Sequence, residues 1–151
     1  MIYCTQEDFV QPILQYNAKQ KLWRLVEDYT MEWGEPGFRK RLIHSAGREY
    51  DKASVPKLLR NIAEHDGVWE GPSFWHDSLY ANEGLFPHLD TFRFETKSPF
   101  GEWKVDPSKW RRKDMDKLLK ESGIWAGARP TQANLYETMV KIYPVNWFKP
   151  F

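Results

Sequence analysis

The sequence predicts an α+β fold in which an N-terminal antiparallel β-hairpin or small sheet packs on about four helices. Two runs rich in strand-forming residues flank the turn signal Gly34-Glu35-Pro36-Gly37, and this arrangement predicts the hairpin. From Val55 onwards, apolar residues recur at helical spacing, which predicts the helices. A second, aromatic hairpin over residues 82–105 is expected to be inserted between helices. The 151 residues are expected to form a single domain, 1–151.

The first strand region is predicted from Lys21 to Trp33 and the second from Phe38 to Tyr50. Aromatic and branched apolar residues are frequent in the first region, and Leu42 with Ile43 forms the apolar centre of the second. Because a short Gly/Pro turn connects the two regions, they are expected to pair antiparallel.

The first helix is predicted to begin at Ser54, a residue type that caps free backbone amides at helix N-termini. Its apolar face is formed by residues at i, i+3, i+4 and i+7, namely Val55, Leu58, Leu59 and Ile62. A short second helix is predicted after Gly71-Pro72-Ser73, and it carries His76 and Asp77 within a strongly apolar run. Adjacent helical residues point about 100° apart, so these two side chains do not face each other.

Residues 82–105 are predicted to form an exposed hairpin. Two alternating segments, Phe92–Glu95 and Trp103–Val105, flank the loop Lys97–Gly101. The aromatic residues of this region are Phe86, Phe92, Phe94, Phe100 and Trp103. Because exposed apolar patches mark interaction surfaces, the hairpin is the predicted contact for protein partners.

Two more helices are predicted in the last third of the chain. Asp106-Pro107 suits the start of the first, since Asp is favoured at the N-cap and Pro at the first helical position. This helix is expected to end at Gly123. The last helix is predicted to begin near Thr131 and to stop at Pro144.

Composition argues against several classes of function. The chain has 22 basic and 21 acidic residues and no basic stripe, which argues against a nucleic-acid partner. A single cysteine, Cys4, allows neither an internal disulfide nor a cysteine-based zinc site. Met1-Ile2-Tyr3-Cys4 lacks the basic region of a signal peptide, and no apolar run approaches the length of a membrane span. A soluble protein without a secretion signal is expected.

Two polar motifs, Tyr50–Pro56 and Ser73–Tyr80, are predicted to converge where the strands meet the helices. The first contributes Asp51 and Ser54 and the second contributes His76 and Asp77. A local interpretation also holds for each motif. Asp51 and Ser54 are typical of a helix cap, and a histidine in an apolar run is typical of a core position with a satisfied ring.

Four segments in this order resemble a phage and prophage family, the domain-of-unknown-function family 1353. They are Lys21–Asp28, Asp51–Pro56, His76–Tyr80 and Arg112–Asp116. The last three segments read D-K-A-S-V-P, H-D-S-L-Y and R-K-D-M-D. The family signatures that they resemble are D-x-A-S-x-P, H-D-x-L-Y and R-x-x-A-D. The resemblance spans roughly residues 20–150 and implies a small α+β domain of phage origin.

The resemblance carries over five polar positions: Asp51, Ser54, His76, Asp77 and Asp116. Three departures from the family pattern accompany it. Met115 replaces the alanine of the third signature, and Arg48 and Tyr50 stand where the family has an aromatic and a small hydroxyl residue. The separation between Tyr80 and Arg112 is also longer than usual, which makes the 82–105 region particular to this chain.

Two hydrolytic mechanisms fit these residues. In the first, Asp51, His76, Asp77 and Asp116 bind Mg²⁺, Mn²⁺ or Zn²⁺, and the divalent metal activates a water molecule. In the second, Ser54 is the nucleophile, His76 is the base, and Asp51 or Asp116 orients the imidazole. For a phage protein the expected substrate is the cell wall or a nucleotide.

The alternative is a non-enzymatic virion component of the tail, neck or baseplate. In that interpretation Asp51 and His76 form a buried hydrogen-bonded pair, and the aromatic hairpin contacts neighbouring proteins. Both interpretations place the protein in the host cytoplasm or in the assembled virion. A solvent-reachable cleft at Asp51, His76 and Asp77 would favour the enzyme, whereas a buried and mutually satisfied cluster would favour the virion component.

Overall fold

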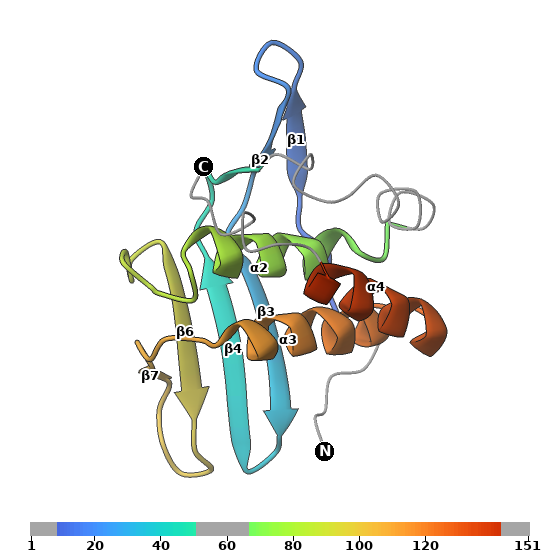
Figure 1. The fold of residues 1–151 in the computed structure, drawn as a ribbon. Coiled ribbons are helices and arrows are strands. Elements are labelled where there is room, and N and C mark those ends of the chain that lie inside the picture. The colour runs from blue at the N-terminus through green and yellow to red at the C-terminus, as the bar shows by residue number, and fades with distance from the viewer. Residues whose placement is uncertain (1–8, 51–66, 143–151) are drawn as a thin grey trace. The chain divides into compact units, whose positions relative to one another are not determined.

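The computed structural model describes residues 9–50 and 67–142 and confirms an α+β fold (Figure 1). The described residues form two antiparallel sheets and three helices. They divide into two compact units, each built from two separate stretches of sequence. The sheet unit comprises 9–50 and 86–108, and the helical unit comprises 67–85 and 109–142.

The larger sheet has the strand order β3-β4-β6-β7, and all neighbouring strands are antiparallel. Its strands are β3 (Tyr29–Glu35), β4 (Phe38–His44), β6 (Phe92–Lys97) and β7 (Lys104–Val105). The predicted hairpin turn is confirmed, because β3 pairs with β4 up to Glu35 opposite Phe38. Gly34 has a φ of +114°, and a Cβ atom there would lie 2.6 Å from the Phe38 carbonyl oxygen. This position therefore requires glycine.

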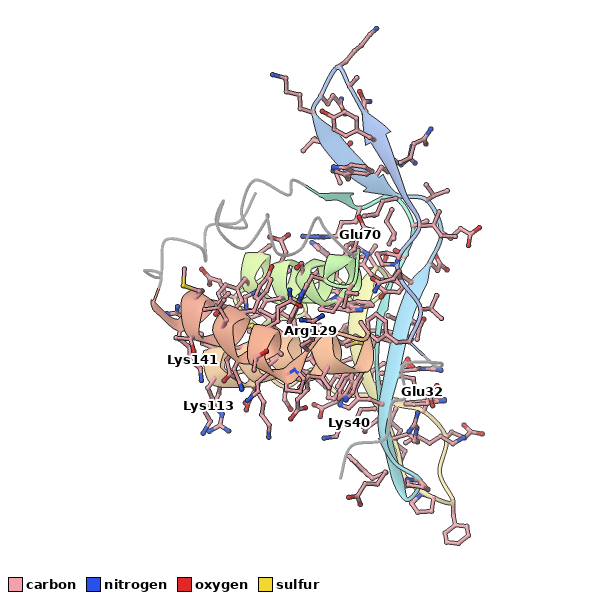
Figure 2. The ribbon with its side chains drawn as sticks, turned by 90° about the vertical axis from the view of Figure 1, so that its right-hand side faces the viewer. Glu32, Lys40, Glu70, Lys113, Arg129 and Lys141 are labelled. Carbon is pink, nitrogen blue, oxygen red and sulfur yellow. The ribbon has the colours of Figure 1, made fainter. Side chains whose placement is uncertain are left out.

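Alternation along the strands separates an apolar face of this sheet from a charged one. The neighbouring residues Met31, Leu42 and Phe94 lie on one face and are buried. The next row, on the opposite face, is Glu32, Arg41 and Glu95. Figure 2 shows Glu32 and Lys40 on opposite sides of the sheet, as this alternation requires.

The aromatic hairpin is not the separate, exposed insertion that the sequence predicts. β6 and β7 do pair as a hairpin, but β6 also pairs with β4 along its whole length, so both strands belong to the larger sheet. Phe86, Phe92 and Phe94 are buried. Only the loop between the strands carries a fully exposed aromatic side chain, Phe100. The prediction failed because alternation in a sequence does not reveal a third strand alongside.

The smaller sheet has the order β1-β2-β5 and is also antiparallel. Its strands are β1 (Leu14–Asn17), β2 (Leu22–Leu25) and β5 (Glu49–Tyr50). The predicted strands 21–33 and 38–50 are each divided between the two sheets. Two breaks cause this division. Asp28 Oδ1 accepts a hydrogen bond of 2.8 Å from the Ala46 amide, and Gly47 has a φ of +102°.

The helical unit contains α2 (Glu70–Ala81), α3 (Arg112–Trp125) and α4 (Pro130–Ile142). The predicted positions of α2 and α4 are confirmed to within about one turn. The predicted start of α3 is wrong, because Asp106 Oδ1 accepts a hydrogen bond of 3.0 Å from the Ser108 amide in a local turn. The helix predicted over 54–62 and the tail after Pro144 lie outside the described residues.

The predicted end of α3 is also wrong. Gly123 lies inside the helix, and the left-handed residue after the helix is Gly127, with a φ of +111°. The Ala128 amide donates to the Gly123 carbonyl at 2.8 Å, and the Gly127 amide donates to the Ile124 carbonyl at 3.0 Å. These two bonds form a Schellman motif, which satisfies the last carbonyls of the helix.

A side chain is excluded at Gly123, inside α3, because an aromatic ring packs against this position. A Cβ atom on Gly123 would lie 2.3 Å from the ring of Trp69, which is itself buried. Trp69 also stacks on Tyr136 of α4, with ring centroids 4.4 Å apart. One indole ring thus joins α3 and α4 in the core. In the part of the chain that is described, no helix is long and apolar enough to cross a bilayer.

We predict that Gly123→Ala destabilises the protein, although alanine is the better helix former by about 1 kcal/mol. The added methyl group overlaps the Trp69 ring, and overpacking of a core costs about 1–3 kcal/mol. Urea denaturation followed by tryptophan fluorescence measures the free energy of unfolding. Gly37→Ala is the matched control, since its Cβ would lie 3.7 Å from Pro99 Cγ, an ordinary contact. A stabilised Gly123→Ala protein would contradict the packing.

Candidate functional site

Two helices of the helical unit each present a pair of polar side chains to the other. His76 and Tyr80 are separated by four positions on α2, and Arg112 and Asp116 are separated by four positions on α3. Residues at i and i+4 lie on one face of a helix, one turn apart. The Trp110 amide donates to the Gly84 carbonyl at 2.8 Å, which holds the segment before α3 beside the end of α2.

The carboxylate of Asp116 is the centre of this cluster. His76 Nε2 lies 2.8 Å from Asp116 Oδ1, and the Tyr80 hydroxyl donates to the same oxygen. Because an ionised carboxylate only accepts hydrogen bonds, Nε2 carries the proton in this contact. Arg112 Nε lies 4.0 Å from Asp116 Oδ2 and donates to the Tyr80 hydroxyl oxygen at 3.2 Å. We call these four residues the Asp116 network.

Three members of the Asp116 network are buried, and the side chain of the fourth, Arg112, is 30% exposed. Asp116 is 2% exposed, Tyr80 is 3% exposed and His76 is 8% exposed. The rings of His76 and Tyr80 also pack together, with centroids 4.0 Å apart. Burial is the main cause that raises the pKa of Tyr80 above its ordinary value, and the hydrogen bond and negative charge of Asp116 raise it further. Tyr80 is therefore a neutral hydrogen-bond donor at physiological pH.

The network extends to the third helix. Arg112 Nη2 donates to the carbonyl of Val140, in the last turn of α4, at 3.1 Å. Helix C-terminal carbonyls have no partner within the helix, and a guanidinium there also compensates the negative end of the helix dipole. A second buried polar contact joins α2 and α4, where the Ser73 and Tyr136 hydroxyls lie 3.0 Å apart. Burial raises the pKa of Tyr136 to about 12 against the opposing effect of Ser73.

The structure brings together two of the predicted site residues, His76 and Asp116. Asp77 is half-buried at the next position of α2. Asp51 and Ser54 lie outside the described residues, so their predicted part in the site stays a prediction. Across 9–50 and 67–142, no three His, Cys, Asp or Glu side chains are grouped as metal ligands. The predicted four-ligand metal site includes Asp51 and remains a hypothesis.

Sequence reasoning missed the other half of the network. Tyr80 and Arg112 were not predicted as site residues, although they stand at the ends of the H-D-S-L-Y and R-K-D-M-D motifs. The available signal was spacing. In each motif the first and last residues are four positions apart, so they lie on one helical face.

The arrangement supports two kinds of chemistry. A carboxylate that accepts a hydrogen bond from an imidazole orients the ring, as in the catalytic triads of hydrolases. The same hydrogen bond between imidazole and carboxylate can instead have a structural role, when further donors surround the buried carboxylate and fix its position. In the Asp116 network the Tyr80 hydroxyl is the further donor, and the Arg112 guanidinium adds a positive charge 4.0 Å from Oδ2.

No protein-family model, curated protein or solved structure matches this chain. The resemblance to the phage and prophage family therefore stays a prediction.

We predict that Asp116→Ala lowers the free energy of unfolding by about 3–5 kcal/mol, because it leaves His76, Tyr80 and Arg112 without their common partner. Asp114→Ala on the same helix is the control. Asp114 forms an exposed ion pair with Arg111 at 3.0 Å, and its loss costs less than about 1 kcal/mol. Urea denaturation of both variants measures the difference. Equal losses in the two variants would refute a stabilising role for Asp116.

Proposed function

We propose that this chain is a phage-encoded structural or assembly component of the virion, of the tail, neck or baseplate. The observation that supports the proposal is the burial of His76, Tyr80 and Asp116. A catalytic histidine must reach its substrate, whereas His76 is 8% exposed and its Nε2 is occupied by Asp116. Hydrogen bonds from α2, α3 and α4 meet in this network, and together they hold three helices in one arrangement.

The second part of the proposal concerns the loop between β6 and β7 as a protein contact. Phe100 in this loop is fully exposed, and Phe38 in the β3–β4 turn is also exposed. The two turns are adjacent, since a Cβ atom on Gly37 would lie 3.7 Å from Pro99 Cγ. Exposed aromatic side chains are frequent energetic centres of protein interfaces. We call Phe38 and Phe100 the aromatic tip. The proposed partner surface is this aromatic tip and no longer the whole 82–105 region.

Metal-assisted hydrolysis is the competing function, and a thermal shift experiment separates the two. For a structural network we expect that Mg²⁺, Mn²⁺ and Zn²⁺ leave the melting temperature of the parent protein unchanged. We also expect that His76→Ala lowers it by about 10 °C, because the Asp116 charge loses a buried donor. His76→Gln, which keeps an N–H donor, should lose less. A metal that raises the melting temperature of the parent but not of His76→Ala would favour a metal site.

A second experiment tests the place of the chain in the virion. In particles purified from a host carrying the phage, we expect mass spectrometry to detect the protein. Phe100→Ala should reduce its incorporation without lowering the melting temperature, because an exposed side chain adds little to stability. Leu135→Ala is the matched control, an exposed apolar residue on α4 whose loss should leave incorporation unchanged. Particles that lack the protein, or that take up Phe100→Ala normally, would contradict the proposal.

A further inference from the structure

A polar groove with a volume of about 530 Å³ lies on the smaller sheet. It is formed by β1, β2, β5 and the turn between β1 and β2, and all of its walls belong to the sheet unit. Figure 2 shows side chains extending from both faces of the β1–β2 hairpin. The groove shares no residue with the Asp116 network or with the aromatic tip, and it does not depend on the function proposed above.

The strand register places the polar groove residues on one face of the sheet. Gln15 of β1 is paired with Arg24 of β2, and Arg24 is paired with Glu49 of β5. Directly paired residues point to the same face, so these three side chains form one row across the sheet. In the next row Tyr16 is paired with Trp23, with ring centroids 5.1 Å apart, and Tyr16 also contributes to the lining of the groove.

The turn between the strands closes one end of the groove. Asn17 Oδ1 accepts hydrogen bonds from the backbone amides of Lys19 and Gln20, at 3.0 and 3.2 Å. Asparagine commonly fixes turns in this way. The Lys19 and Gln20 side chains are therefore carried on a defined turn at the groove, and the floor is the sheet itself.

The charged groups around the groove have no ionic partner among residues 9–50 and 67–142. Arg24 and Glu49 are cross-strand neighbours of opposite charge, yet neither forms an ion pair with any residue in the described ranges. Lys19 likewise has no carboxylate partner among the described residues. All three side chains are exposed. Two cations, one carboxylate and the Gln15 and Gln20 amides thus surround a single concave space.

We propose that this groove binds a sugar that carries one anionic group. The guanidinium of Arg24 offers a planar pair of donors that matches a carboxylate or phosphate, and Lys19 adds a second positive charge. Glu49 and the two amides can accept and donate the hydrogen bonds of neighbouring hydroxyl groups. A neutral sugar would leave both cations without a partner, and a simple anion would leave Glu49 and the amides unused. The volume is in the range of small-ligand sites.

Isothermal titration calorimetry on the full chain tests the proposal. The probes are glucuronate and glucose phosphate as anionic sugars, glucose as the neutral sugar, and acetate and inorganic phosphate as free anions. We expect at least one anionic sugar to bind about tenfold or more tightly than glucose and than its own free anion, since a charge-assisted hydrogen bond contributes at least this much. The better of the two anionic sugars identifies the carboxylate or the phosphate as the preferred group.

Variants then assign the binding to the groove. Arg24→Ala should weaken binding of the anionic sugar by about tenfold to a hundredfold, and Glu49→Gln should weaken it less. Lys104→Ala removes one exposed cation from β7 in the larger sheet and is the matched control, with unchanged affinity expected. No binding of either anionic sugar, equal binding of glucose or of the free anion, or full affinity in Arg24→Ala would each overturn the proposal.

Discussion

The helical unit depends on how the carboxylate of Asp116 is satisfied. Removing an ionised carboxylate from water costs several kcal/mol, so a side chain that is 2% exposed needs donors from its neighbours. His76 and Tyr80 provide them from α2, and Arg112 provides charge from the preceding turn of α3. Because Arg112 also donates to the Val140 carbonyl of α4, the groups that satisfy one charge position three helices.

The sheet unit also contains a buried carboxylate, and a different set of donors satisfies it. Glu95 is also buried, and Arg41 and Arg93 donate to its carboxylate at 2.8 and 2.9 Å. Burial alone would raise the pKa of Glu95, but the hydrogen bonds and charges of the two arginines outweigh it and lower that pKa. The Trp103 ring covers Arg41 at 4.0 Å. Two permanent cations satisfy Glu95, whereas Asp116 relies mainly on an imidazole and a phenol.

Local signals in the sequence predicted the elements that depend on local chemistry, namely the Gly34 turn and the positions of α2 and α4. Predictions failed where a distant partner decides the outcome. Gly123 has the appearance of a helix end in sequence, but the Trp69 ring determines its role. Two of the four network residues, His76 and Asp116, were predicted, because histidine and aspartate are common catalytic groups. Tyr80 and Arg112 completed it, and only their i, i+4 spacing relative to His76 and Asp116 indicated this.

A structural and a catalytic histidine can make the same hydrogen bond to a carboxylate, so the remaining contacts of the carboxylate distinguish them. In a hydrolase triad the carboxylate directs its charge to the imidazole that takes up a proton. Asp116 instead shares Oδ1 between His76 and the Tyr80 hydroxyl, and its Oδ2 faces the Arg112 guanidinium. The carboxylate therefore has two hydrogen-bonding partners and one nearby positive charge. These contacts come from α2 and from α3 itself, so the buried carboxylate connects the two helices through a shared polar network.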